Sequence, residues 1–378
     1  MKINDFKLEV FFTRHEFTAP HLLAQSDCES MPAKELLALE PGAEEIFLKT
    51  WLGYTQVPGS PELRESVAGL YQNIDMDHII IHAGAQEAIF NFMNIFLKRG
   101  DHIITQFPVY QSLYEIAKSI GCSISKWQIR QSEKGWFMNP EDLEKLIRPE
   151  TRLICINTPN NPTGYAFSED QMIHIAEIAD RHGLYVFSDE VYKGLELNKI
   201  KSPWFADIYE KAVSLGVMSK AYGLAGLRIG WIAARDREIL EKMIKMKHYT
   251  SICSSSLSEN LAIIALRHGN AILKKNMGII KSNLEISDKF FSRNKELFLY
   301  NRPMAGPIAF HKINIDMPVL QFCNDLIEKK GVLLLPGDVF DYQEPYFRMG
   351  YGRADFSENL EVFEEYLDEN QDKLTSFI

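Results

Sequence analysis

The segment with the clearest chemical potential centres on Lys220, in Ser219-Lys-Ala-Tyr-Gly-Leu-Ala-Gly-Leu-Arg-Ile-Gly-Trp231. Short apolar runs over residues 213–217 and 229–234 predict strands on either side, so rigid elements position this lysine. A lysine that burial and nearby positive charge keep neutral is a nucleophile. The alternative is a surface lysine in a glycine-containing loop. The small residues and Arg228 around it favour the chemical role.

Two further polar segments follow predicted strands. Asp189 follows the apolar run 184–188, and Asn160-Asn-Pro-Thr-Gly164 follows the run 153–157. Open α/β sheets bind ligands beyond the carboxyl ends of their strands, and an acid there suits a buried cation. Asp189 could instead cap a helix, and the segment 160–164 could be only a turn.

A phosphate site is predicted where the strand 79–81 turns through Gly84 into a helix. The first amides of that helix, from Ala85 and Gln86, have no intrahelical acceptor, and helix N-termini bind anions. A guanidinium and a hydroxyl would add to this cup, from Arg228 and Ser219.

Three more candidates stand near strands or in turn-rich segments. Tyr110 follows the strand 103–106, Arg348 lies in the apolar run 346–351, and Tyr54 opens the segment Tyr-Thr-Gln-Val-Pro-Gly. The alternatives are a packed core tyrosine for Tyr110 and Tyr54, and an ion pair on an edge strand for Arg348.

The elements that must position these residues alternate between strand and helix from about residue 78 to 235, which is typical of a parallel sheet with helices on both faces. A helical stretch after about 255 leads into strands at 308–313, 332–335 and 346–351. We expect an α/β fold with a smaller α/β domain. The predicted division is an N-terminal segment 1–45 that contributes to the small domain, a large domain 46–270 and a small domain 271–378.

Composition excludes several classes of function. The net charge of −10 opposes binding to nucleic acid or to an anionic membrane. Five widely spaced cysteines suggest reduced thiols and no zinc site, and Met1–Val10 lacks a signal-peptide core, so we expect a cytoplasmic protein without metal. The motifs GxSxG, HExxH, Walker A and GxGxxG are missing from the sequence.

The lysine segment resembles the SK…GLxGxRxG motif of class I/II aminotransferases, which are fold-type I pyridoxal 5′-phosphate (PLP) enzymes of the aspartate aminotransferase superfamily. The resemblance covers nearly the whole chain. It implies that Lys220 holds PLP as a Schiff base and moves a proton between the substrate Cα and the cofactor C4′. Asp189 then pairs with the pyridine N1–H, and Tyr192 and Asn161 hydrogen-bond the cofactor O3′.

The same resemblance assigns the other candidates. Tyr110 stacks on the ring, while Gly84, Ala85, Gln86, Ser219 and Arg228 hold the phosphate. Relatives often have a second hydroxyl where this chain has Val217, so the cup here is thinner or filled by another group. Arg348, with Asn161, takes the substrate carboxylate. Tyr54 resembles a tyrosine that reaches the phosphate of the neighbouring subunit, which implies a homodimer with shared active sites.

Three functions remain open at this point. The first is transfer of an amino group between an L-amino acid and a 2-oxo acid. The second is PLP-dependent elimination, replacement or cyclisation, because Leu8-Glu9, Ser26-Asp27 and the glycine-rich stretch look somewhat like capreomycidine synthase and its relatives. The third is a PLP-binding regulator, but no basic helix-turn-helix precedes residue 40. The segment 247–254 contains no arginine for a distal carboxylate, so a dicarboxylic substrate is disfavoured unless Lys247 or His248 substitutes.

Overall fold

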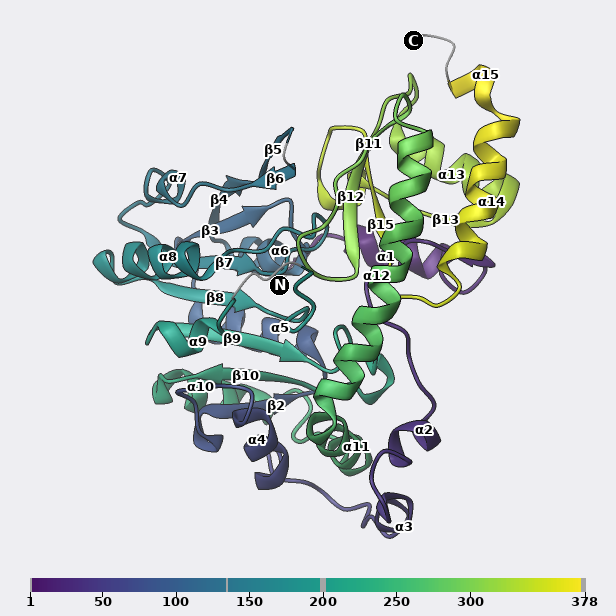
Figure 1. Cartoon of the computed structure of the whole chain (residues 1–378). Helices are drawn as coiled ribbons and strands as arrows, with labels where there is room; N and C mark the ends of the chain where they lie inside the picture. Colours follow the sequence, from purple (N-terminus) through teal and green to yellow (C-terminus); the bar gives the residue numbers. More distant parts are fainter. Residues whose placement is uncertain (1, 134, 198–201, 375–378) are drawn as a thin grey trace.

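The computed structural model describes residues 2–133, 135–197 and 202–374. Its centre is a seven-stranded sheet in the order β2-β10-β9-β8-β7-β3-β4 (Figure 1). The strands are β2 (Ile79–His82), β3 (His102–Phe107), β4 (Ser123–Gln128), β7 (Thr151–Asn157), β8 (Tyr185–Asp189), β9 (Ala212–Val217) and β10 (Gly230–Ala234). All neighbours pair in parallel except β10, which is antiparallel to β2 and β9. The predicted α/β class with a mostly parallel sheet is confirmed.

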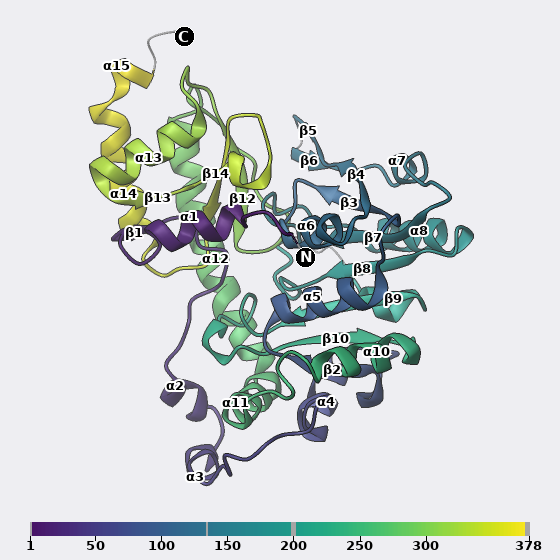
Figure 2. The ribbon, with the colours of Figure 1, turned by 180° about the vertical axis from the view of Figure 1, so that it is seen from behind.

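Helices cover both faces of this sheet (Figures 1 and 2). Successive residues of β2 point to opposite sides, so Ile80 joins one apolar cluster while Ile79 and Ile81 join another. One face packs against α5 (Ala85–Phe96), α6 (Ser112–Ile120) and α10 (Arg237–Lys247). The other packs against α4 (Pro61–Ala68), α8 (Glu169–Arg181), α9 (Phe205–Ile208) and α11 (Ser256–Arg267). Burial on both faces explains why the strands appear as continuous apolar runs.

A smaller antiparallel sheet has the order β11-β12-β15-β14. Its strands are β11 (Phe298–Leu299), β12 (Ile308–Ile313), β14 (Leu335–Pro336) and β15 (Tyr346–Gly350), and the helices beside it are α12 (Gly269–Arg293), α13 (Val319–Lys330) and α14 (Phe356–Glu369). The single strand predicted over 332–335 is wrong: β13 (Val332–Leu333) pairs with β1 (His21–Leu22), and β14 pairs with β15. The N-terminal helix α1 (Lys7–His15) contacts the 3₁₀ turn η3 (Gly337–Phe340). The domain boundaries stay a prediction.

Short elements complete the described chain. They are α2 (Ala33–Leu37), α3 (Ala43–Leu48), η1 (Met76–His78), the hairpin strands β5 (Arg130–Ser132) and β6 (Gly135–Phe137), α7 (Glu141–Glu144), η2 (Ala225–Leu227) and α15 (Gln371–Leu374). The alternating pattern predicted helices between most strands, and the Lys220 segment was predicted as a turn between two strands. Between β9 and β10 the connection contains only η2, because the two strands are antiparallel.

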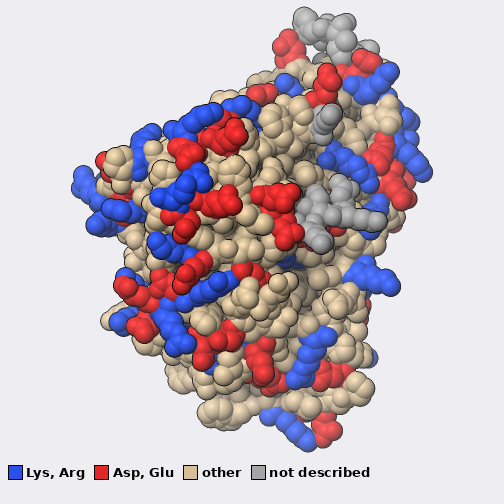
Figure 3. All heavy atoms as spheres, turned by 60° about the vertical axis from the view of Figure 1, so that its left-hand side comes forward, with Lys and Arg blue, Asp and Glu red and all other residues tan. Residues whose placement is uncertain are grey.

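Acidic and basic side chains are interspersed on the face that Figure 3 shows, without a continuous basic stripe there. Within the described ranges, no helix has both the length and the apolar character needed to cross a membrane. The expectations that the protein has no nucleic-acid or membrane partner, and that it is cytoplasmic, stay predictions.

Candidate active site

A cavity of about 380 Å³ lies at the carboxyl ends of the central strands. Asn157 and Asp189, the last residues of β7 and β8, are paired in register and bring two polar side chains to one edge of the sheet. The cavity collects ten of the predicted site residues, namely Ala85, Gln86, Tyr110, Asn161, Asp189, Tyr192, Ser219, Lys220, Arg228 and Arg348. Gly84 and Tyr54 do not line it.

Lys220 reaches this cavity from the loop between β9 and β10. Because these strands are antiparallel, the loop stays at the sheet edge where β7 and β8 end. The Lys220 Nζ donates to Ser26 Oγ at 2.9 Å. Burial lowers the pKa of Lys220; the positive charge of Arg348 acts in the same direction, and nearby carboxylates, led by Asp27, oppose it. The side chain is therefore held inside the protein, and the reading of a surface lysine is wrong.

Asp189 is 4% exposed, and its Oδ1 accepts a hydrogen bond from the Val191 amide at 3.3 Å. A turn, not a helix, follows it over residues 191–194, so the reading of a helix cap is wrong. Burial raises the pKa of Asp189 to about 7, against smaller opposing effects of the Val191 amide and Lys220. A carboxylate in this position gains from a cationic partner in the cavity.

Arg348 joins the small sheet to the cavity. It is fully buried; its Nη1 donates to Asn161 Oδ1 at 2.9 Å and its Nη2 to the Ala24 carbonyl at 2.7 Å. Its strand β15 lies between β12 and β14, and no carboxylate pairs with it among the described residues, so the reading of an edge-strand ion pair is wrong. The Arg348 Nε is buried without a partner in the described part of the chain. Such a donor favours a ligand that supplies an acceptor.

The predicted phosphate cup forms where β2 turns into α5. Gly84 has φ +84°, and a side chain there would place its Cβ 2.4 Å from Arg228 Nη2. A Cβ on Gly230 would lie 2.9 Å from the Ala85 amide nitrogen. Arg228 itself has φ 51°, a left-handed conformation that non-glycine residues adopt at a cost and that clusters at ligand sites. The Arg228 guanidinium and Gly230 are thus packed closely against the backbone at the first turn of α5.

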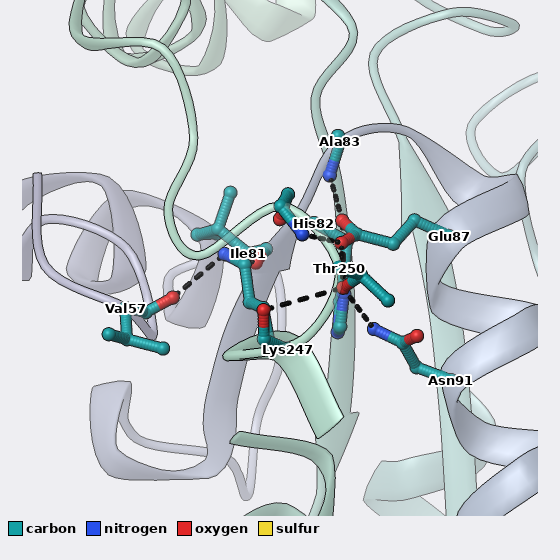
Figure 4. A network of polar contacts seen from close by, with 9 residues as sticks. Val57, Ile81, His82, Ala83, Glu87, Asn91, Lys247 and Thr250 are labelled. Carbon is teal, nitrogen blue, oxygen red and sulfur yellow. Dashed lines mark hydrogen bonds and ion pairs between the residues drawn. The ribbon is translucent and has the colours of Figure 1, made fainter. Parts of the chain in front are cut away.

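A buried polar network supports this cup from behind (Figure 4). Glu87 accepts from the Ala83 amide at 2.6 Å and from Thr250 Oγ1 at 2.6 Å, and His82 Nδ1 lies 3.5 Å from the carboxylate. Burial raises the pKa of Glu87, but these hydrogen bonds outweigh burial and hold the pKa well below its usual range. Lys247 is fully buried and donates to carbonyls of Val57 and Ile81 at 2.7 and 2.5 Å. The sequence did not reveal this role for Glu87 and Lys247.

The family model described as aminotransferase class I and II matches residues 25–363. The chain belongs to this family. It is 24% identical over 364 residues to capreomycidine synthase from Streptomyces vinaceus, a match that covers 95% of this chain and 93% of the relative. Among solved structures, a PLP-dependent aminotransferase from Streptococcus suis 89-1591 aligns with a TM-score of 0.91 at 34% identity, over 98% of this chain and 99% of that one. The PLP-dependent cyclase OrfR aligns with a TM-score of 0.90 at 25% identity, over 98% of each chain. The predicted fold type I is confirmed.

Members of the aminotransferase class I and II family depend on PLP, and PLP is the cofactor of this chain. The residues present suit each part of it. Lys220 offers an amine, Asp189 an acid for the ring nitrogen, and the α5 N-terminus with Arg228 an anion site. Because Gly84 has no Cβ, the Arg228 guanidinium can lie directly against the turn into α5, which places this cation beside the helix N-terminus.

The two predicted tyrosines Tyr110 and Tyr54 differ in their position relative to the cavity. Tyr110 lines the cavity, its hydroxyl donates to Glu9 Oε1 at 3.2 Å, and its ring lies 4.9 Å from that of Phe6. Tyr54 is 83% exposed, so the reading of a core tyrosine is wrong. It does not contact the cavity of its own chain, and its role at a neighbouring subunit stays a prediction.

Sequence reasoning missed most of one cavity wall, which the N-terminal segment forms. Its residues are Leu8, Glu9, Phe12, Glu16, Gln25, Ser26 and Asp27. Only the pairs Leu8-Glu9 and Ser26-Asp27 were noticed, and only as a likeness to other proteins. The available signal was the spacing of Leu8, Phe12 and Glu16 at i, i+4 and i+8, which places them on one side of a helix.

Proposed function

We propose that this member of the family is an aminotransferase that moves an amino group between an L-amino acid and a 2-oxo acid, with Lys220 as the residue that attaches PLP. The observation that carries the proposal is one cavity lined by a half-buried lysine, Lys220, and by a fully buried arginine, Arg348, whose Nε has no partner among the described residues. The lysine suits the amine chemistry, and the arginine suits an α-carboxylate. The 34% identity to an aminotransferase from Streptococcus suis supports the reaction type.

The bound cofactor supplies an electron sink for the substrate α-carbon. Asp189 keeps the ring nitrogen protonated, which sustains that capacity. Lys220, whose pKa burial lowers, would move a proton between the substrate Cα and the cofactor C4′. Arg348 orients the substrate through its carboxylate, and Asn161 fixes the arginine through the 2.9 Å hydrogen bond. Tyr192 and Asn161, which line the same cavity, would donate hydrogen bonds to the cofactor O3′.

A single-turnover experiment tests this proposal. The PLP-loaded protein is mixed with a panel of L-amino acids without a 2-oxo acid. Aminotransfer predicts conversion of the cofactor to pyridoxamine phosphate, with one equivalent of 2-oxo acid formed per site. Turnover with the cofactor unchanged and no 2-oxo acid formed from any amino acid would contradict the proposal.

A second candidate is PLP-dependent cyclisation. It rests on the similarity to capreomycidine synthase over 95% of this chain and to the cyclase OrfR over 98%. The same experiment separates the two functions, because a cyclase regenerates PLP and releases a ring-containing amino acid. Mass spectrometry of the products distinguishes that outcome from a 2-oxo acid.

We also propose that the active unit is a homodimer with shared sites. The segment that contains Tyr54 exposes further large apolar side chains, with Trp51 80% and Leu52 74% exposed. Exposed apolar patches of this kind mark association surfaces. The test mixes inactive Tyr54→Ala and Lys220→Ala protomers. Recovery of activity after verified subunit exchange supports shared sites, and no recovery contradicts them.

A further inference from the structure

The N-terminal wall of the cavity carries charge that the proposed chemistry does not use. It contributes three carboxylates, from Glu9, Glu16 and Asp27, and no lysine or arginine. Glu9 and Glu16 belong to or directly follow α1, and Asp27 follows β1. The wall faces a space that also contains Lys220 and Arg348.

The cationic residues of the cavity already have partners. Arg228 is assigned to the phosphate, Arg348 to the α-carboxylate and Lys220 to the cofactor, while Asp189 is assigned to the ring nitrogen. These assignments leave the three carboxylates of the N-terminal wall without a role in the proposed reaction. Within the described part of the chain, Asp27 is the only one of the three that forms an ion pair, with Arg353 at 2.9 Å.

Glu9 and Glu16 have neutral partners. Glu9 accepts from the Tyr110 hydroxyl at 3.2 Å, and Glu16 accepts from the Gln25 amide at 3.1 Å. Over the described ranges, no lysine or arginine forms an ion pair with either carboxylate. Burial raises the pKa of Glu16; the Gln25 hydrogen bond and the charge of Lys220 oppose this rise, while the charges of Asp27 and Glu9 add to it. The carboxylates are therefore close enough to repel one another, and a cation between them would relieve that repulsion.

A separate observation shows that this cavity is built for a ligand with a carboxylate at its other end. The buried Arg348 Nε has no partner within the described residues. Among the described residues, the only lysines and arginines that line the cavity are Lys220, Arg228 and Arg348, so no further cationic side chain is present there for a second carboxylate. Lys247, which was a candidate for that role, is buried and already donates to the carbonyls of Val57 and Ile81.

We propose that the amino donor is an L-amino acid with a positively charged side chain, a guanidinium or an ammonium, which Glu9 and Glu16 bind. The inference rests on the proposed function, because Arg348 must hold the α-carboxylate for the side chain to reach the N-terminal wall. Glu9 and Glu16 are specificity residues in this arrangement and take no part in proton transfer.

Binding can be measured without turnover by using ligands that lack the α-amine. One matched pair is 5-guanidinopentanoate and its neutral analogue 5-ureidopentanoate; a second is 6-aminohexanoate and 6-hydroxyhexanoate. Isothermal titration calorimetry on the PLP-loaded protein gives each dissociation constant. A charge-assisted hydrogen bond contributes about 1.5–3 kcal/mol, so at least one cationic ligand should bind roughly 10- to 100-fold more tightly than its neutral analogue.

The double variant Glu9→Gln/Glu16→Gln should reduce that preference to within about threefold, and the affinity for the neutral ligands should stay unchanged. Glu296→Gln, which removes an exposed negative charge beside Lys295, should preserve the preference. Equal affinities within both pairs in the wild-type protein would overturn the inference, as would tighter binding of glutarate than of either cationic ligand. A preference that survives in the double variant would also overturn the assignment to Glu9 and Glu16.

The outcomes also separate this inference from the proposed function. If cationic ligands bind preferentially but no L-amino acid yields pyridoxamine phosphate, the side-chain specificity stands and aminotransfer fails. If neutral amino acids yield pyridoxamine phosphate and neither cationic ligand is preferred, aminotransfer stands and the specificity fails.

Discussion

Replacing Asp189 by asparagine should stabilise the cofactor-free protein at neutral and alkaline pH. Asp189 is 4% exposed, and burial raises its pKa from the ordinary 3.8 to about 7. Asparagine has nearly the same shape and can still accept from the Val191 amide. The difference of about three pH units corresponds to roughly 4 kcal/mol, which folding must supply to keep the carboxylate ionised above pH 7.

The sign follows from proton binding. Between about pH 4 and pH 7 the folded state holds a proton on Asp189 that the unfolded state has released, so the free energy of unfolding falls as pH rises. It levels off above about pH 7. The variant lacks this titration. Relative to the difference between the two proteins near pH 4, the free energy of unfolding of the variant should therefore exceed that of the wild type by up to about 4 kcal/mol more at pH 8.

Urea unfolding of both cofactor-free proteins at several pH values measures this difference. An unchanged difference between pH 4 and pH 8, or a wild-type protein that gains stability over the variant in that range, would refute the reasoning. With PLP and substrate present, the variant should lose most of its turnover, because the ring nitrogen no longer has an acid partner. Stability and activity should therefore change in opposite directions.

Three other substitutions give distinct results. In Arg348→Lys, one ammonium cannot donate to Asn161, to the Ala24 carbonyl and to the substrate carboxylate with the geometry of the guanidinium. The KM for the amino donor should therefore rise about 10- to 100-fold in steady-state assays. An unchanged KM would show that Arg348 does not bind the substrate. Tyr54→Phe should weaken PLP binding by roughly one to two orders of magnitude by fluorescence titration if the hydroxyl reaches a neighbouring phosphate, and should leave it unchanged otherwise. Glu87→Gln leaves the Ala83 amide or the Ser251 amide without its acceptor. The affinity for PLP should therefore fall about tenfold, while the affinity for pyridoxal, which lacks the phosphate, should stay the same. Equal losses of affinity for PLP and for pyridoxal would mean that Glu87 has a general structural role.

The sequence predicted those elements whose environment is uniform. Strands such as β2, β7 and β8 are buried on both faces, so they appear as apolar runs. Two predicted site residues near their ends, Asp189 at the end of β8 and Asn161 after β7, line the cavity. The edge strand β4 was missed because its residues alternate between exposed and buried and include Ser, Lys and Gln. The predicted strand 332–335 divides at Leu334 because its two halves pair with strands from opposite ends of the chain.

Local pattern indicates only part of the N-terminal wall, the helix side shared by Leu8, Phe12 and Glu16, and it does not indicate what that side faces. Helix α1 has nine residues and no side-chain cap at Phe6, so the usual signals of a helix start are missing. The contacts that complete the site join distant segments: Lys220 to Ser26, and Arg348 to Asn161 and Ala24. These contacts form because the small sheet packs against the ends of the central strands, and the spacing of residues in the sequence does not predict that packing.

The central claim is that Lys220 holds the cofactor, and the most direct measurement is chemical. Borohydride reduction of the PLP-loaded protein fixes the cofactor to its lysine, and peptide mapping by mass spectrometry identifies that residue. Lys247 serves as an internal comparison, because it is buried and donates to two carbonyls behind the cup. We predict a single label on Lys220, in the peptide that contains Ser219 and Ala221. A label on Lys247 or any other lysine, with Lys220 unmodified, would contradict the account.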